Sequence, residues 1–216
     1  VARAQAALTA LPVYRRDRVV ESNLERDLSA VLDTLSAIVD NDMLSVEKRA
    51  SMMSSWLPGV TRNVLTAVAD PRTFKSLNKA AREYQKAAFT RGLIDYGNPI
   101  RRNGYREITV VDGDTEQTRA VSDVLDQGKL DQVIREEALA RFGNNLNRAL
   151  VFFELVRSQL QPNLVFDGDE TNRRRDASMG MVKDYFEVSN SERIIAKHDK
   201  VTNEQQRILT LSLIHI

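Results

Sequence analysis

Two short Asp-Gly-Asp segments come nearest, in residue type and spacing, to metal-binding chemistry. They are Asp112-Gly113-Asp114 and Asp167-Gly168-Asp169. Two carboxylates one residue apart can ligate a hard cation such as Mg²⁺ or Ca²⁺. An EF-hand loop also needs Gly at its sixth position and Glu at its twelfth, and neither segment supplies them. We therefore interpret both segments as glycine turns with an acid near a helix N-terminus, and we expect no metal ion.

Other site chemistry finds little support in the residue types present. The chain has no cysteine, which excludes disulfides, a thiol nucleophile and cysteine-ligated metal centres. His198 and His215 are its only histidines, and no serine lies in a G-x-S-x-G elbow. Neither common glycine-rich phosphate loop is present. We therefore expect no cofactor and favour a role other than catalysis, although the many acids leave open a carboxylate pair assembled by the fold.

Arginine clusters are the main candidates for a binding surface. They could contact phosphate groups, or they could form a solvated or protein-binding face paired with neighbouring acids. A further polar segment, with Asn144 and Arg148, interrupts the apolar period of a predicted long helix, where helix propensity alone would not place several asparagines. The candidate contact residues for a nucleic acid or a protein partner are Arg173, Arg174, Arg175, Arg101, Arg102, Asn144 and Arg148.

The overall charge does not indicate either kind of partner. The chain has 31 Lys and Arg against 30 Asp and Glu, so its net charge points to neither a nucleic acid nor a membrane surface. No apolar run approaches the roughly 18 residues that a spanning helix needs, and the N-terminus lacks a signal-peptide pattern. We therefore expect no membrane contact and favour a reducing intracellular compartment or a virion.

Helical periodicity dominates the elements that must position these residues. Apolar residues recur every three or four positions over 20–38 and again over 139–160, within a predicted helix from 129 to 161. Another helix is predicted to begin at Thr115. Residues 106–111 and 164–166 predict short strands that could pair as a ribbon. The predicted fold class is all-α, a multi-helix domain of seven or eight helices with room for one short two-stranded β ribbon.

The chain divides in sequence into two helical halves, residues 1–97 and 115–210, joined by an irregular or β connector over 98–114. It begins with Val1 rather than Met, and it ends in the apolar stretch 211–216. Those six residues also correspond to the translation of a transposase end sequence used as a sequencing adapter. We therefore expect a non-native tail and a natural protein that continues beyond about Thr210; the alternative is a genuine apolar end.

Amphipathic helices, balanced charge and the lack of recognisable site chemistry favour a structural or interaction protein. The hypothesis is a non-enzymatic helical component of a larger assembly, such as a fragment of a viral or phage structural protein, with protein partners that are copies of itself or other subunits. The alternative is a helical nucleic-acid-binding protein that uses its arginine clusters. An enzyme is the third class.

Overall fold

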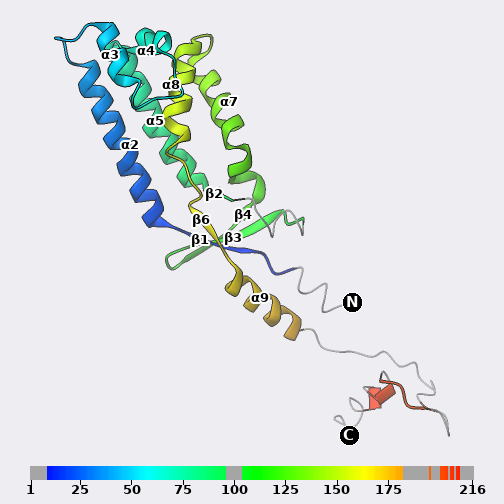
Figure 1. Cartoon of the computed structure of the whole chain (residues 1–216). Helices are drawn as coiled ribbons and strands as arrows, with labels where there is room; N and C mark the ends of the chain where they lie inside the picture. The colour runs from blue at the N-terminus through cyan, green and yellow to red at the C-terminus, as the bar shows by residue number, and fades with distance from the viewer. Residues whose placement is uncertain are drawn as a thin grey trace.

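The computed structural model describes residues 9–95, 104–181, 195, 200–203, 205, 206, 208 and 209. A long arm of helices stands at one end of a small β-sheet, and a further helix leaves the opposite side of that sheet (Figure 1). Four longer helices form the arm, and two shorter ones pack at its far end. They are α2 (Arg18–Val39), α5 (Pro71–Arg91), α7 (Leu130–Phe142) and α8 (Leu146–Arg157), with α3 (Val46–Met53) and α4 (Arg62–Val68).

The arm forms because each long helix has an apolar stripe that must be buried. In α2 the stripe of Leu24, Leu28, Leu32 and Leu35 is almost fully buried, as its period predicts. α2 packs against α5, and α5 packs against α8. Asp70 caps α5, with its side chain accepting from Thr73 N at 2.9 Å. One hydrophobic core contains residues of α2, α5, α7 and α8 together.

Within the described residues, six strands form one mixed sheet that curves into a half-barrel. The order across the sheet is β4-β3-β1-β6-β2-β5. β1 lies near its centre, parallel to β3 on one side and antiparallel to β6 on the other. The strands are β1 (Val13–Arg16), β2 (Leu93–Ile94), β3 (Glu107–Asp112), β4 (Thr115–Ala120), β5 (Leu125–Asp126) and β6 (Leu164–Asp167).

Three further elements complete the path of the chain. The 3-10 turns η1 (Val121–Asp123) and η2 (Gln127–Lys129) flank β5 and lead into α7. α9 (Gly168–Gly180) follows β6 directly, with Asp167 as its N-cap. Thr171 of α9 accepts a hydrogen bond from Val13 N at 2.9 Å, so α9 is fastened to β1 as well as to β6.

The predicted all-α fold class is wrong. Helices do make up 62% of the structure, but the sheet is a full second part of the fold and not a ribbon. The two predicted strands exist as β3 and β6, yet they do not pair with each other, because β1 lies between them. The helix predicted from Thr115 is instead β4, which forms a hairpin with β3 across the turn at Gly113.

The predicted helix over 129–161 is also wrong in its continuity. It is two helices, α7 and α8, that pack against each other as a hairpin. Gly143 ends α7 with a φ of +54°, and the Asn145 side chain caps α8 by accepting from Arg148 N at 3.1 Å.

Candidate functional site

The arm joins the sheet at the point where β1 passes into α2. Asp17 lies between the two elements and caps the helix, its carboxylate accepting from Val19 N and Val20 N at 3.0 Å each. Its own backbone N–H donates to Asn163 O at 2.8 Å, just before β6 begins. The start of the arm is therefore bonded to both central strands of the sheet.

Four polar side chains form a buried group at this joint, which we call the junction cluster: Arg16, Glu21, Gln85 and Asn163. Asn163 is fully buried; its Oδ1 accepts from Leu93 N at 2.6 Å, and its Nδ2 donates to Phe89 O at 3.1 Å. Nδ2 also donates to the Glu21 carboxylate. Because isolated buried polar groups are costly, this mutual satisfaction holds β6, α5 and α2 in one arrangement.

Gln85 and Arg16 are the other two members of the cluster. Gln85 Nε2 donates to Leu24 O and Gln159 O at 3.0 and 3.1 Å, which joins α5 to α2 and to the segment after α8. Arg16 pairs with Glu21 at 3.3 Å, and both side chains are more than nine-tenths buried. A buried pair of this kind stabilises one geometry strongly once it is formed, because losing either partner strands the other charge.

Two arginines cap the C-terminal end of α5. Arg16 donates to Phe89 O and Thr90 O at 3.1 and 3.2 Å, and Arg119 of β4 donates to Thr90 O and Arg91 O at 3.0 and 3.1 Å. The last carbonyls of a helix lack partners within the helix and carry partial negative charge, so both contacts are favourable. The arm is thus tied to the β3–β4 hairpin as well as to β1.

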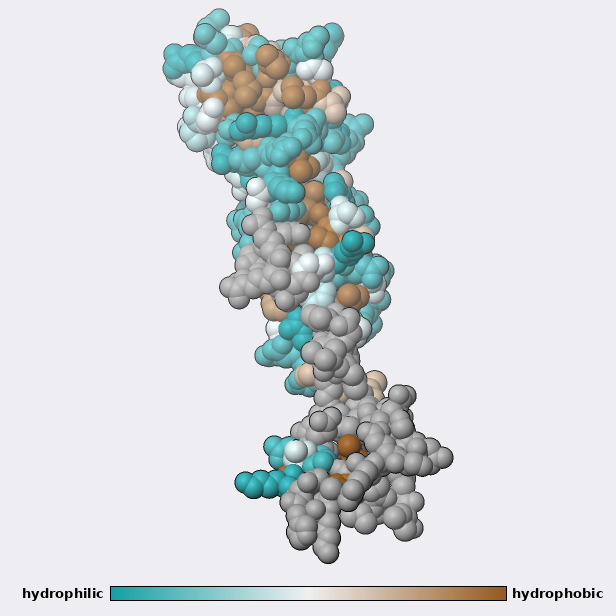
Figure 2. Space-filling view, turned by 90° about the vertical axis from the view of Figure 1, so that its right-hand side faces the viewer, coloured by the Kyte–Doolittle hydropathy of each residue, from teal (hydrophilic) through white to brown (hydrophobic). Residues whose placement is uncertain are grey.

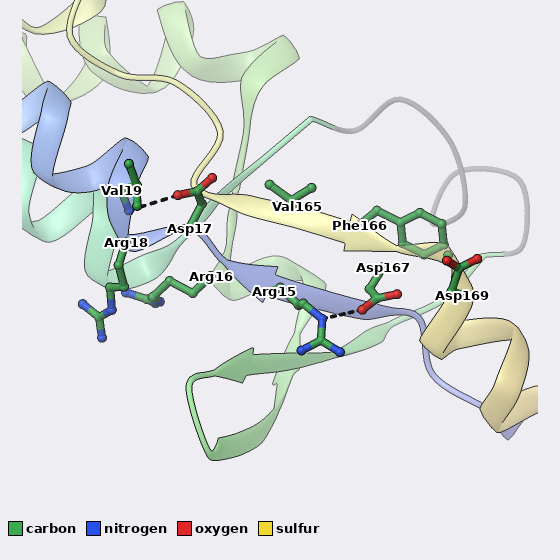
Figure 3. Close-up of a pocket in the computed structure, with 10 residues that line it drawn as sticks. Arg15, Arg16, Asp17, Arg18, Val19, Val165, Phe166, Asp167 and Asp169 are labelled. Carbon is green, nitrogen blue, oxygen red and sulfur yellow. Dashed lines mark hydrogen bonds and ion pairs between the residues drawn. The ribbon is translucent and has the colours of Figure 1, made fainter.

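Two surface clefts open at the junction and share Arg16 and Arg18. The larger, of about 590 Å³, is lined by β1, the start of α2 and β6, with Val19, Val165 and Phe166 as its apolar part (Figure 3). Three arginines and three aspartates line it, so its formal charge is balanced. The smaller, of about 270 Å³, is lined by Arg16, Arg18 and Arg119 against Asp112. In both, the arginines are largely engaged by acids or carbonyls of the protein itself.

Several carboxylates on the sheet are held in their ionised form. Hydrogen bonding to Arg18 holds the pKa of Asp112 below its usual range. The pKa of Asp167 is lowered first by the backbone N–H of Glu170 and then by Arg15, which it contacts in Figure 3. The pKa of Glu116 is lowered by its hydrogen bonds from Arg174. These groups fasten β1 to α9, α2 to β3 and β4 to α9.

We expect these carboxylates to make the sheet acid-sensitive. Their pKa values are lower in the folded chain, so their stabilisation is complete above their ordinary pKa values of about 4 and is lost as the pH falls through the folded values. Urea unfolding at stepped pH should show falling stability below about pH 4. The double variant Asp112→Asn, Glu116→Gln should be less stable than the parent near neutrality and should converge with it in acid. Parallel curves would contradict this account.

The family comparison identifies the kind of domain. A family model described as 7TMR-HDED, 7TM-HD extracellular, matches residues 1–212. The chain belongs to the 7TMR-HDED family. No curated protein and no solved structure matches the chain. Members of the family are extracellular sensory domains of 7TM-HD receptor proteins, so the predicted viral or phage structural component, with its virion setting, is wrong.

The family is an extracellular domain of a membrane protein. Among the described residues of this 7TMR-HDED domain, no helix is long and apolar enough to cross a membrane. The same residues contain no group of three His, Asp or Glu side chains placed to hold a metal ion. The two Asp-Gly-Asp segments are a hairpin turn at Gly113 and the N-cap of α9 at Asp167.

The predicted contact residues do not come together in the 7TMR-HDED domain. Arg173, Arg174 and Arg175 lie on α9, beside the sheet. Asn144 and Arg148 lie at the far end of the arm, where Arg148 donates to Thr73 Oγ1 at 3.0 Å. Arg101 and Arg102 lie outside the described residues, as do His198 and the tail 211–216.

The arginines of α9 are used within the fold. Arg174 donates to both carboxylate oxygens of Glu116, at 2.7 and 2.8 Å, and to Glu170 at 2.8 Å; these acids raise its pKa. Arg173 pairs with Glu170 at 3.0 Å. Arg175 donates to the Tyr105 hydroxyl at 3.0 Å. The paired face that sequence offered as an alternative describes these side chains better than a phosphate-binding surface, which overturns the nucleic-acid interpretation together with the structural-protein one.

Sequence reasoning missed the junction cluster. Arg16 was visible only as part of a basic run, and Glu21 and Asn163 are 142 positions apart. One signal was present: Glu21 lies three residues before Leu24, on the buried side of α2, where every other buried residue is apolar. An acid in that position requires a buried partner, although the sequence does not say which one.

Proposed function

We propose that this domain senses a ligand with its helical arm and transmits the state of the arm to the rest of the receptor through β1 and β6. One observation carries the proposal: the described chain enters the sheet through β1 and leaves it through β6 and α9, and these two strands pair with each other at four positions. Whichever side leads to the membrane, the connection therefore passes through a strand that is bonded to the base of the arm.

The junction cluster supplies the mechanical link in this proposal. A tilt of α2 or α5 against the sheet moves Glu21 or Phe89, and both are bonded to Asn163 at the start of β6. Buried hydrogen-bond networks and packed cores have discrete arrangements, so a small displacement in the arm is converted into a change of the strand pair and is not absorbed locally. A ligand shifts this equilibrium by as much as it favours one arrangement over the other.

Protein partners, either further copies or other subunits, remain part of the proposal. The remainder of the receptor is the first such partner, because a sensory domain acts only through what it is attached to. Exposed apolar side chains at Met43 and Trp56, at the end of the arm away from the sheet, support a second contact.

The coupling can be tested with nitroxide labels on two cysteines, since the native chain has none. Ala140→Cys labels the exposed side of α7, and Asp176→Cys labels α9. We expect one narrow distance distribution by pulsed EPR. Glu21→Gln should broaden it or add a second population, because it removes the buried charge that holds Arg16 and Arg18.

The matched control is Glu25→Gln, an exposed glutamate one turn further along α2, which should leave the distribution unchanged. Circular dichroism establishes that each variant is folded. If folded Glu21→Gln gives the same distribution as the parent, the junction cluster does not hold the arm to the sheet and the proposed route of transmission is wrong.

A further inference from the structure

An apolar groove runs between α7 and α8 on the outer face of the arm. Its lining is Arg135, Ala138, Leu139, Leu146, Ala149, Leu150, Phe153 and Glu154, and its volume is about 400 Å³. Leu139, Leu146 and Leu150 are 50%, 61% and 50% exposed. Figure 2, which faces the side of the molecule that carries α7, shows hydrophobic surface gathered at the end of the arm away from the sheet. Three half-exposed leucines around one concavity are typical of a binding surface.

The two arginines beside this α7–α8 groove differ in whether they already have an acidic partner. Arg135 and Arg157 both lie over the Phe153 ring, at 5.1 and 5.8 Å from its centroid. Arg157 is already paired with Asp131 at 3.0 Å, whereas Arg135 has no ion pair within the described part of the chain. A cation held against an aromatic face at the edge of an apolar floor is ready to accept an anionic group.

Glu154 is the one acid that lines the groove, and its carboxylate points away from the leucines. The Glu154 carboxylate packs against Gly59 in the turn between α3 and α4, so closely that a Cβ added to Gly59 would lie 2.6 Å from it. Its charge is therefore directed toward that turn. What remains for a ligand is a floor of leucine, alanine and phenylalanine with a single available guanidinium at its edge.

We infer that the α7–α8 groove binds a small amphiphilic carboxylate, with its apolar chain along the leucines and its carboxylate at Arg135. The inference rests on the proposed sensory function and names the ligand class for it. A volume of about 400 Å³ is within the range for one small molecule. A second copy of the chain would instead need about 800 Å² from each partner, much more than a groove between two helices of three turns provides.

The groove is placed so that its ligand can act on the junction. α8 ends at Arg157 and leads within seven residues to β6, and the Gln159 carbonyl on the way accepts from Gln85 of the junction cluster. A ligand that wedges α7 and α8 into one spacing therefore bears directly on the segment that enters β6. Occupancy of the groove would in this way change the position of the sheet relative to the arm.

Calorimetric titration of the whole chain with dodecanoate, kept below its micelle concentration, tests the site. We expect saturable binding at one ligand per chain. Arg135→Gln should weaken it about tenfold through loss of a charge-assisted contact, and Leu150→Glu should abolish it. Dodecanol, the uncharged analogue, should bind the parent and Arg135→Gln equally. The matched controls Arg72→Gln and Met43→Glu, which change exposed residues elsewhere on the arm, should bind like the parent.

Three outcomes overturn the inference. They are the absence of saturable binding, binding that Leu150→Glu leaves intact, and sedimentation showing a dimer that Leu150→Glu dissociates, in which case a second copy is the occupant. Because all four altered side chains are exposed, folding should persist, and circular dichroism checks it. If dodecanoate binds without changing the α7-to-α9 label distance, the site stands and the proposed sensory function is wrong. If dodecanoate does not bind while Glu21→Gln still changes the label distance, only the proposed site is wrong.

Discussion

Asn163→Ala should lower the free energy of unfolding by about 3 kcal/mol or more, the cost expected when one change strands several buried polar groups. Asn163 is fully buried and satisfies Leu93 N, Phe89 O and the Glu21 carboxylate at once. Alanine removes all three contacts and leaves an opening too small to hydrate each group well. Urea denaturation followed by circular dichroism measures the effect, with the same dependence of the unfolding free energy on urea concentration used for parent and variant.

Asn144→Ala is the matched control for this prediction. Asn144 lies exposed in the turn between α7 and α8, so its loss should change stability by less than about 0.5 kcal/mol, as for other surface sites. A similar small effect of Asn163→Ala would mean that water or a neighbouring side chain replaces its hydrogen bonds, and that the arm is not anchored through β6.

The helices could be predicted from sequence because their burial is periodic. Most of the sheet could not. β3 follows the pattern for a strand, with Ile108 and Val110 buried. β1 contains two arginines in four residues, and β2 and β5 have two residues each, too few for any period. β4 is an edge strand with no apolar side chain in its first five residues, so neither face gave a signal. These strands exist because β1 and β6 bring them together, a long-range effect that local patterns do not contain.

The sequence contains a signal for the break between α7 and α8, but the apolar spacing across it is the stronger pattern. Apolar spacing continues from Leu139 through Phe142 to Leu146 as if one helix ran on, and this favoured continuity. Gly143 and the asparagines after it were the contrary signal, because glycine ends helices and asparagine caps them. The half-exposed Leu139 and Leu146 now explain the misleading period: they face the groove and not a core.

Gly92→Ala should be among the most destabilising single changes in the chain, costing about 3 kcal/mol through backbone strain and overpacking together. Gly92 ends α5 with a φ of +89°, a conformation that residues with a side chain rarely adopt. Its Cβ would also lie 2.4 Å from Cδ1 of Leu164, which is buried at the start of β6. The close approach of α5 to β6 at the junction thus depends on a missing side chain.

Gly113→Ala is the comparison for a positive φ without a steric contact. Gly113 also has a positive φ, +58°, but a Cβ there meets nothing within 4 Å, so only strain of about 1 kcal/mol should appear. The difference between the two variants in urea unfolding then reports the contact between Gly92 and Leu164 together with the extra strain at Gly92, whose ψ of 135° lies outside the left-handed helical region. Since that contact and the Asn163 hydrogen bonds hold the same two elements, Gly92→Ala should also broaden the label distance between α7 and α9, and Gly113→Ala should not. Equal destabilisation by the two variants would show that the end of α5 can move away from β6 at little cost, which the proposed transmission does not allow.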